Sequence, residues 1–324
     1  MRVANMNVIS ATLTQALSFI DGIIGNYGVS VIVFTLLVRL VLLPLDIKSK
    51  KSTRAMERVK PQLDYINKKY AQDKEKLNQK TMELYQKEKI SPLAGCLPML
   101  IQLPILFCMF TAMRVVANEK TVEMIMGMMN GVAPQFDSFL WIKNIFQPDS
   151  LGATILPSYE RAISYIQTAK LDFVAPEELQ AIYNAYLTAN YGVNQFMTLR
   201  ILLFNITVPT TWTALTAYSN GLFILPLFAG LSQVFMTRLT GMQQPQPAAS
   251  NDPNAAAANN MANGAMMKWF FPLFSLYICA TQNAAFSIYW AVANIIAIVQ
   301  QICISKYFDH QDKLAAAKAE TSEE

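Results

Sequence analysis

The sequence has little charge and few of the residues that enzymes use for chemistry. Only 15% of its 324 residues are Asp, Glu, Lys or Arg, and it has one histidine. That histidine, His310, lies in the C-terminal tail, and no glycine-rich phosphate-binding pattern occurs. The long apolar stretches contain no pair of acidic residues, and no nucleophile has a suitably placed base. These absences argue against an enzyme, and we expect no cofactor.

Cysteine is also scarce, and its positions exclude two further classes. Cys96, Cys108, Cys279 and Cys303 all fall in apolar stretches and lack the spacing of metal ligands. A disulfide framework and a zinc site are therefore not expected. We interpret these side chains as small apolar packing residues.

Apolar residues, in contrast, are abundant. They make up 53% of the chain, and the mean hydropathy is +0.26, a profile typical of a polytopic membrane protein. Five stretches are long and apolar enough to be considered as membrane spans, with apolar cores at 29–45, 93–113, 221–239, 266–281 and 284–304. The sequence thus predicts an all-α membrane protein with five transmembrane helices.

The charges between these stretches predict an orientation in the membrane. The loop 46–90 contains 13 basic and 7 acidic residues, whereas 116–220 contains 5 basic and 8 acidic residues. The positive-inside rule then places 46–90 in the cytoplasm, the N-terminus outside and the C-terminus inside. The predicted order is an external amphipathic helix (1–26), first span (27–45), cytoplasmic helical hairpin (46–90), second span (91–115), external loop (116–220), third span (221–239), disordered cytoplasmic loop (240–265), fourth and fifth spans (266–305) and cytoplasmic tail (306–324).

The loop 46–90 has the pattern of two antiparallel helices with a narrow apolar seam. Apolar residues recur at helical spacing in each arm, at Met56, Val59, Leu63, Ile66 and Tyr70 and then at Leu77, Leu84 and Tyr85. Its charges form either a solvated face or a docking surface for anionic lipids, ribosomal RNA or an acidic protein.

The external loop contains a second moderately apolar segment at 196–218. If this segment were a sixth span, the basic residues at the ends of all later spans would lie outside the cell, against the positive-inside rule. We therefore favour an external segment that lies at the interface or folds there. The larger region 148–218 has alternating apolar patterns that suggest a small helical cap. Residues 8–24 place apolar residues at helical spacing and suggest an amphipathic helix on the membrane surface.

Polar residues inside the predicted spans point to the functional site. Arg39 lies within VSVIVFTLLVRLVLLPL, where a charge costs about 2.5–3.5 kcal/mol on insertion scales, and no other span contains an acidic residue to pair with it. Thr35 shares its helix face. Further polar residues occur in the other spans, at Gln102, Gln233, Thr237, Ser287, Trp290, Asn294 and Gln301. Taken singly these residues are interhelical hydrogen-bonding groups, but Arg39 favours a water-filled cavity that they line together.

Several stretches resemble one known family. The segments NYGVSVIVFTLLVRLVLLPL, MELYQKEKISPLAGCLPMLIQLPILFCMF, FLWIKNI and FSIYWAVANIIAIVQQICISKYF are similar to those of the YidC/Oxa/Alb membrane protein insertases of the bacterial five-span type. The resemblance implies a hydrophilic groove open to the cytoplasm and to lipid but closed outside. It also implies that Arg39 is the groove arginine, Thr35 its neighbour, and Trp290 an aromatic residue facing the substrate. The long insertion 148–218 and the weakly basic tail depart from the family pattern.

These observations lead to one main hypothesis and two rivals. The main hypothesis is a bacterial membrane insertase and chaperone that works without an energy source, alone or beside the Sec translocon. The implied partners are nascent membrane proteins with acidic external tails, anionic lipids, the ribosome and the signal recognition particle receptor, but not DNA. The substrate groove would comprise Arg39, Thr35, Gln102, Gln233, Ser287, Trp290 and Asn294. The alternatives are a small-anion transporter that uses Arg39 as its binding charge and a structural assembly factor.

Overall fold

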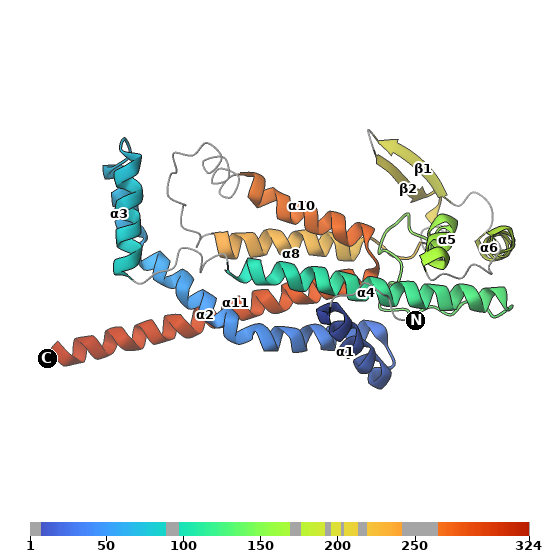
Figure 1. The fold of residues 1–324 in the computed structure, drawn as a ribbon, viewed down its shortest axis with the longest axis horizontal. Helices are drawn as coiled ribbons and strands as arrows, with labels where there is room; N and C mark the ends of the chain where they lie inside the picture. The colour runs from blue at the N-terminus through green and yellow to red at the C-terminus, as the bar shows by residue number, and fades with distance from the viewer. Residues whose placement is uncertain are drawn as a thin grey trace. The chain divides into compact units, whose positions relative to one another are not determined.

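Most of the described chain is helical. The computed structural model describes residues 8–88, 97–168, 176–191, 196–201, 204–212, 219–241 and 265–323. The predicted disordered loop 240–265 lies almost entirely outside these ranges. The elements, shown in Figure 1, are α1 (Val8–Ile24), α2 (Tyr27–Lys69), α3 (Lys74–Lys87), α4 (Leu97–Met129), α5 (Tyr159–Thr168), α6 (Pro176–Tyr191), β1 (Phe196–Ile201), β2 (Phe204–Pro209), α8 (Ile224–Gly241), α10 (Ala265–Thr281) and α11 (Ala284–Glu323).

The chain divides into two compact units. The first comprises Met1–Thr35, Ile105–Ala229 and Ser275–Val292, and the second comprises Leu36–Pro104, Gly230–Phe274 and Ala293–Glu324. Helices α2, α4, α8, α10 and α11 each contribute residues to both units.

In the first unit, a tight connection joins α1 to α2. Gly25 adopts a left-handed backbone conformation, with φ at 71°, which a residue without Cβ adopts at low cost after a helix end. The side chain of Asn26 then accepts the backbone N–H of Val29 at 3.1 Å, as an N-cap residue does. Ser30 donates its hydroxyl to Asp21 at 3.0 Å. Local hydrogen bonds therefore fix the turn between α1 and α2.

A buried pair of asparagines organises the loop that follows α4. Asn144 and Asn220 are 3% and 0% exposed. The Asn220 side chain accepts the backbone N–H of Asn144 at 2.8 Å and donates to the carbonyls of Asn144 at 2.8 Å and Pro148 at 2.9 Å. Asn144 donates in turn to the carbonyl of Ile155 at 2.9 Å. Because a buried polar backbone group is costly when unpaired, these bonds hold the irregular loop against the residues just before α8.

Asp149, which is 0% exposed, fixes the start of α8. Its carboxylate accepts the backbone N–H groups of Phe223 at 3.0 Å and Leu225 at 2.8 Å, and the indole N–H of Trp141 at 3.3 Å. A carboxylate at this position pairs the free N–H groups of the helix N-terminus and matches the positive end of the helix dipole. Gly221 is required beside it, since a Cβ there would overlap the carboxylate.

The same loop also holds the start of α11. The backbone N–H of Ala284 donates to the carbonyl of Gln147, and that of Ala285 donates to the carbonyl of Ile145, each at 2.9 Å. The loop thus joins the beginnings of α8 and α11 by hydrogen bonds.

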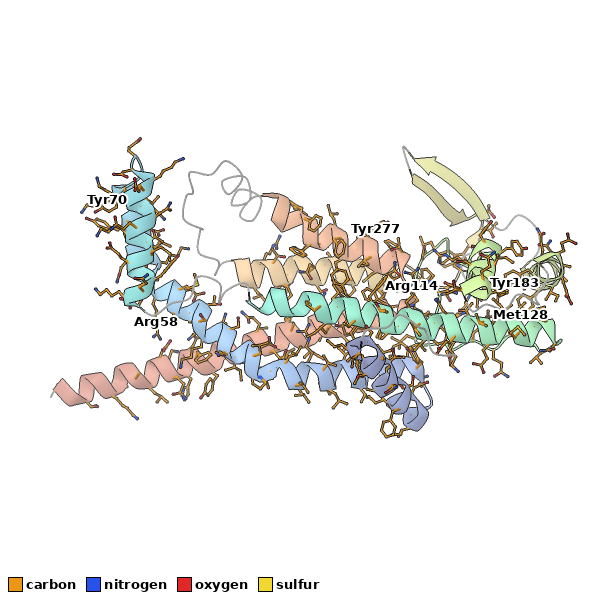
Figure 2. All side chains as sticks on the ribbon, viewed as in Figure 1. Arg58, Tyr70, Arg114, Met128, Tyr183 and Tyr277 are labelled. Carbon is orange, nitrogen blue, oxygen red and sulfur yellow. The ribbon has the colours of Figure 1, made fainter. Side chains whose placement is uncertain are left out.

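The insertion 148–218 contains two helices that pack on the end of α4. Ile125 of α4, Ala162 and Ile166 of α5, and Leu179 and Tyr183 of α6 form one buried cluster. Figure 2 labels Tyr183 on α6 and Met128 on α4. The small helical cap suggested by the sequence corresponds to this cluster.

The segment 196–209 differs from an all-α fold. Strands β1 and β2 pair antiparallel, with Phe196 opposite Pro209 and Ile201 opposite Phe204. Its residues include Thr, Ile, Val and Phe, which favour strands. The all-α prediction is therefore wrong for this short segment, and a helical sixth span is excluded over β1 and β2.

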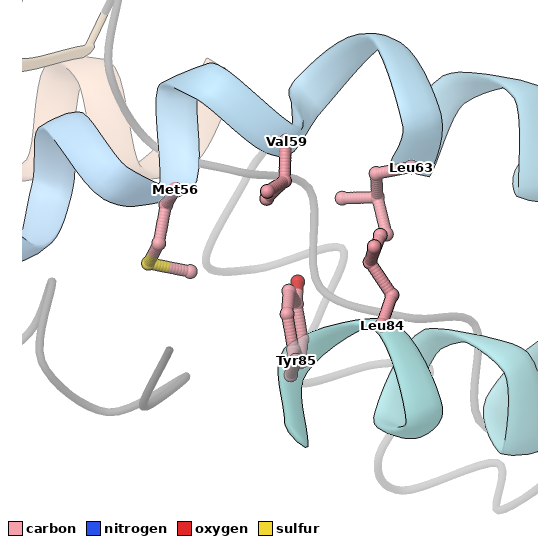
Figure 3. Packing of buried hydrophobic residues seen from close by; sticks show 5 residues of the cluster. All are labelled: Met56, Val59, Leu63, Leu84 and Tyr85. Atoms are coloured by element: carbon pink, nitrogen blue, oxygen red, sulfur yellow. The ribbon is translucent and has the colours of Figure 1, made fainter. Parts of the chain in front are cut away.

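In the second unit, the hairpin of α2 and α3 encloses an apolar cluster. Met56, Val59 and Leu63 of α2 pack against Leu84 and Tyr85 of α3 (Figure 3). These five residues belong to the seam predicted from helical spacing, and Ile66 packs against the cluster. Asp73 caps α3 by accepting the backbone N–H of Lys76 at 3.1 Å.

Two of the described helices are long and apolar enough to cross a membrane, namely Tyr27–Lys69 and the part Ala284–Ala315 of α11. Val8–Ile24, Ile224–Leu239 and Trp269–Thr281 are apolar but shorter. The structure thus agrees with a helical membrane protein, and the number of five spans stays a prediction.

The bonds of Asp149 lead to a test of stability. Asp149→Ala removes the acceptor from the buried N–H of Leu225 and from the part-buried N–H groups of Trp141 and Phe223, and a buried unpaired donor costs about 1–3 kcal/mol. We expect a clearly lower melting temperature for the detergent-solubilised protein and faster amide exchange at Phe223 and Leu225. Asp149→Asn, which keeps one acceptor oxygen, should lie between Ala and the unmodified protein. Glu160→Ala, at an exposed carboxylate, is the control, and equal melting of both alanine variants would contradict this role.

Candidate functional site

Helix α2 carries the first two predicted site residues, Thr35 and Arg39. Thr35 is 1% exposed and donates its hydroxyl to the carbonyl of Val31 at 2.6 Å. Its polar group is therefore satisfied within its own helix. Such a bond to the preceding turn is the usual solution for a threonine in an apolar helix.

Arg39 is half-buried and has two neighbours that the sequence analysis did not find. Its backbone carbonyl accepts a hydrogen bond from the side chain of Gln300 on α11 at 3.4 Å. Burial raises the pKa of Asp46, and the positive charge of Arg39 opposes that rise. The search for an acidic partner in other spans therefore missed a carboxylate on the same helix. Asp46 follows Arg39 by about two helical turns, and this spacing was the available signal.

Ser287 and Trp290 lie in the part of α11 that belongs to the first unit. Ser287 is 0% exposed and donates its hydroxyl to the carbonyl of Cys279 at 2.9 Å, across the turn between α10 and α11. The Trp290 ring packs against Phe286, with the ring centroids 5.7 Å apart. Its indole N–H is buried and has no hydrogen-bond partner in the described part of the chain. Ser287 is thus satisfied locally, whereas no described residue pairs with the indole N–H of Trp290.

Asn294 and Gln233 lie in the second unit, on α11 and α8. The side-chain amide of Asn294 donates to the hydroxyl of Ser232 at 2.8 Å, so this bond joins α8 and α11. The carbonyl of Gln233 accepts the hydroxyl of Thr237 at 2.8 Å within α8. Ser232, which the sequence analysis did not select, is the partner that makes Asn294 an interhelical contact.

The seven predicted site residues are thus distributed over both units. The second unit brings Asn294 to Ser232 and Gln300 to Arg39. The first unit contains Thr35, Ser287 and Trp290. Gln102 belongs to α4, and its side chain lies outside the described residues. The membership of these residues in one groove stays a prediction.

Among the residues that the structure describes, no group of three His, Cys, Asp or Glu side chains could hold a metal ion. The polar chemistry of these helices is that of one guanidinium with amides, hydroxyls and an indole. Such groups bind carboxylates and water.

Comparison with known proteins gives a consistent family assignment. Residues 19–312 match the family described as 60Kd inner membrane protein. A membrane protein insertase YidC from Fusobacterium nucleatum subsp. nucleatum is 40% identical over 166 residues, which cover 50% of this chain and 72% of the relative. The protein of that name from Caldanaerobacter subterraneus subsp. tengcongensis is 35% identical over 187 residues, which cover 58% and 81%. That from Rickettsia rickettsii is 27% identical over 300 residues, which cover 93% of this chain and 39% of the relative.

Proposed function

The chain belongs to the 60Kd inner membrane protein family, and from this membership we propose that it is a membrane protein insertase. In this proposal it inserts nascent membrane proteins and helps them fold. The reaction makes and breaks no covalent bond, so it requires no catalytic residue and no cofactor.

The observation that carries the proposed mechanism is the guanidinium of Arg39 in an apolar helix. A charge at that depth is costly and marks a functional position by default. Asp46 opposes part of its charge from the same helix, but a guanidinium offers five donors in a planar arrangement. We infer that Arg39 faces water and that this water occupies a groove between the helices.

Two buried polar atoms support hydration of these helices. Trp290 Nε1 and Gln300 Oε1 have no hydrogen-bond partner in the described part of the chain. Buried polar groups in folded proteins are almost always paired with protein or with ordered water. Water, or a polar group of a bound substrate, would satisfy both.

The mechanism follows from the position of the charge. A hydrated groove shortens the apolar distance that the external tail of a substrate must cross. Arg39 attracts acidic residues of that tail, since the attraction between opposite charges grows as the local dielectric constant falls. The apolar span of the substrate then leaves sideways into lipid, and burial of its apolar surface, worth about 25 cal/mol per Å², drives the step.

The proposed orientation places the basic hairpin of α2 and α3 in the cytoplasm and the N-terminus outside. The hairpin would then receive the substrate first. Its basic surface suits anionic lipids and ribosomal RNA, and the Sec translocon and the signal recognition particle receptor remain candidate partners.

Reconstitution distinguishes insertion from anion transport. The purified chain in liposomes should insert a single-span test protein without ATP and should not move a labelled anion across the bilayer. Anion movement without insertion would favour the transporter hypothesis. Failure of both would favour a purely structural role.

Hydration of the proposed groove can be tested by cysteine labelling. Single cysteines at Thr35, Gln233 and Trp290, in a chain with its four native cysteines replaced, should react with a water-soluble maleimide added from the cytoplasmic side. The reaction requires a thiolate and therefore water. A cysteine at Leu231, whose side chain is 69% exposed on an apolar surface, is the lipid-facing control. Protection at all three groove positions would indicate a dry bundle joined by hydrogen bonds.

The role of Arg39 can be tested by changing its charge. Arg39→Ala should slow insertion of acidic-tailed substrates by about tenfold, which corresponds to about 1.4 kcal/mol, and should affect neutral-tailed substrates less. Arg39→Lys should keep much of the activity, because the attraction survives without the planar geometry. The Ala variant should accumulate in the membrane, since removing a charge there relieves a cost. The Lys variant keeps the charge and should accumulate to the same level as the unmodified protein. Loss of the Ala variant from the membrane, or full activity of that variant, would contradict the proposal.

A further inference from the structure

Helix α2 carries a series of basic residues beyond Arg39, and the C-terminal helix α11 covers part of it. Lys50, Arg54 and Arg58 follow Arg39 along α2. On an ideal helix with 3.6 residues per turn, these four positions fall within about a third of the circumference. They therefore form a mainly basic face that leads from the hairpin base to Arg39, and all four residues belong to the second unit. The same spacing places the carboxylates of Asp46 and Glu57 on this face too.

Arg54 is held by both neutral and acidic groups of α11. It donates to the carbonyl of Ser305 at 3.2 Å, and its guanidinium lies 5.5 Å from the centre of the Phe308 ring. It also forms ion pairs with Asp309 and, at 3.0 Å, with Asp312. The ring and the carbonyl contact the guanidinium without neutralising it, so its charge is balanced only by the two carboxylates in this set of contacts.

Arg58 and Lys50, which lie on either side of Arg54 along α2, also interact with acidic residues. Arg58 pairs with Asp312 at 2.7 Å, and its own side chain is 70% exposed; Figure 2 labels it on α2. Lys50 is 4% exposed. Burial lowers its pKa, while the nearby carboxylates of Glu57 and Asp309 oppose the decrease. The acidic residues of the tail thus act on three successive basic positions.

The acidic partners are placed so that other carboxylates can replace them. The side chains of Asp309 and Asp312 are 59% and 51% exposed, and they share one helix face at a spacing of three. The pair of Arg58 with Asp312, both more than half exposed, is weak and screened by salt. The side chain of Arg54 is 16% exposed, so only the carboxylate partners of its ion pairs lie open to water. The contact therefore resembles a reversible latch more than a permanent structural bond.

We propose that Arg54 and Arg58 are further recognition residues for the acidic tail of a substrate, and that Asp309 and Asp312 occupy them as a competing, substrate-like segment until a substrate arrives. This inference rests on the proposed insertase function. In the resting state, the tail of α11 would thus block access of a substrate to the basic face of α2.

The first test releases the tail. Full-length protein is reconstituted in liposomes of phosphatidylethanolamine and phosphatidylglycerol, and the initial insertion rate is measured for a single-span protein with an acidic tail and for its Asn/Gln-tailed counterpart. Asp309→Asn with Asp312→Asn should raise the rate about threefold for the acidic tail at low salt, and not for the neutral tail. The gain should shrink at an ionic strength near 1 M, where the Debye length is about 3 Å. Glu177→Gln with Glu178→Gln changes the net charge equally on the exposed surface of α6, outside the hairpin and the proposed groove, and is the matched control.

The second test removes the receiving charges. Arg54→Gln with Arg58→Gln should slow the acidic-tailed substrate by about threefold, and adding Asp309→Asn and Asp312→Asn to it should give no further gain. Thermal melting of each purified variant checks that the fold is intact.

The outcomes separate this inference from the function on which it rests. An unchanged rate after the aspartate substitutions, an equal gain for both substrates, or an equal gain in the Glu177/Glu178 control would overturn the latch and leave the insertase function standing. Failure of the unmodified chain to insert either substrate would overturn the proposed function itself.

Discussion

Most of this structure depends on one constraint: a polar group that is buried away from water costs free energy unless it has a hydrogen-bond partner. Thr35 and Ser287 meet it with the nearest backbone carbonyl, and Asn294 meets it across two helices with Ser232. Arg39 carries a charge and five donors, so one nearby carbonyl is not enough for it. In the proposed mechanism water supplies further partners, and this is how a single arginine leads to the proposed hydrated groove.

The same rule explains the loop between α4 and α8. Irregular backbone can be buried in a folded protein only where its polar groups are paired. Asn144, Asn220 and Asp149 supply these partners from side chains, and the buried carboxylate sits at the N-terminus of α8, where the helix dipole favours it. Since Ala284 and Ala285 bond to the same loop, the starts of α8 and α11 are held together by it.

The sequence predicted those features that depend on local periodicity. The steps of three and four between Met56, Val59 and Leu63 identified side chains that the structure buries against Leu84 and Tyr85. Contacts between distant positions were not accessible in this way. Neither asparagine of the Asn144–Asn220 pair has a local pattern that distinguishes it from a solvated residue, and Arg54 and Asp309 each looked like part of an exposed charge run. For the site, the polar positions could be selected from the sequence, but which of them are satisfied locally depends on neighbours such as Ser232 and Gln300.

Arg39 and Arg54 show how one residue type serves two steps of the proposed route. Arg54, whose own side chain is 16% exposed, meets carboxylates that are more than half exposed, where salt screens the attraction. At Arg39 the lower dielectric constant strengthens the attraction, but the carboxylate must give up more of its hydration to reach it. These two terms oppose each other in the proposed route, so the charges serve to guide an acidic tail along α2. The driving free energy comes in the final step, in which the apolar span of the substrate enters lipid.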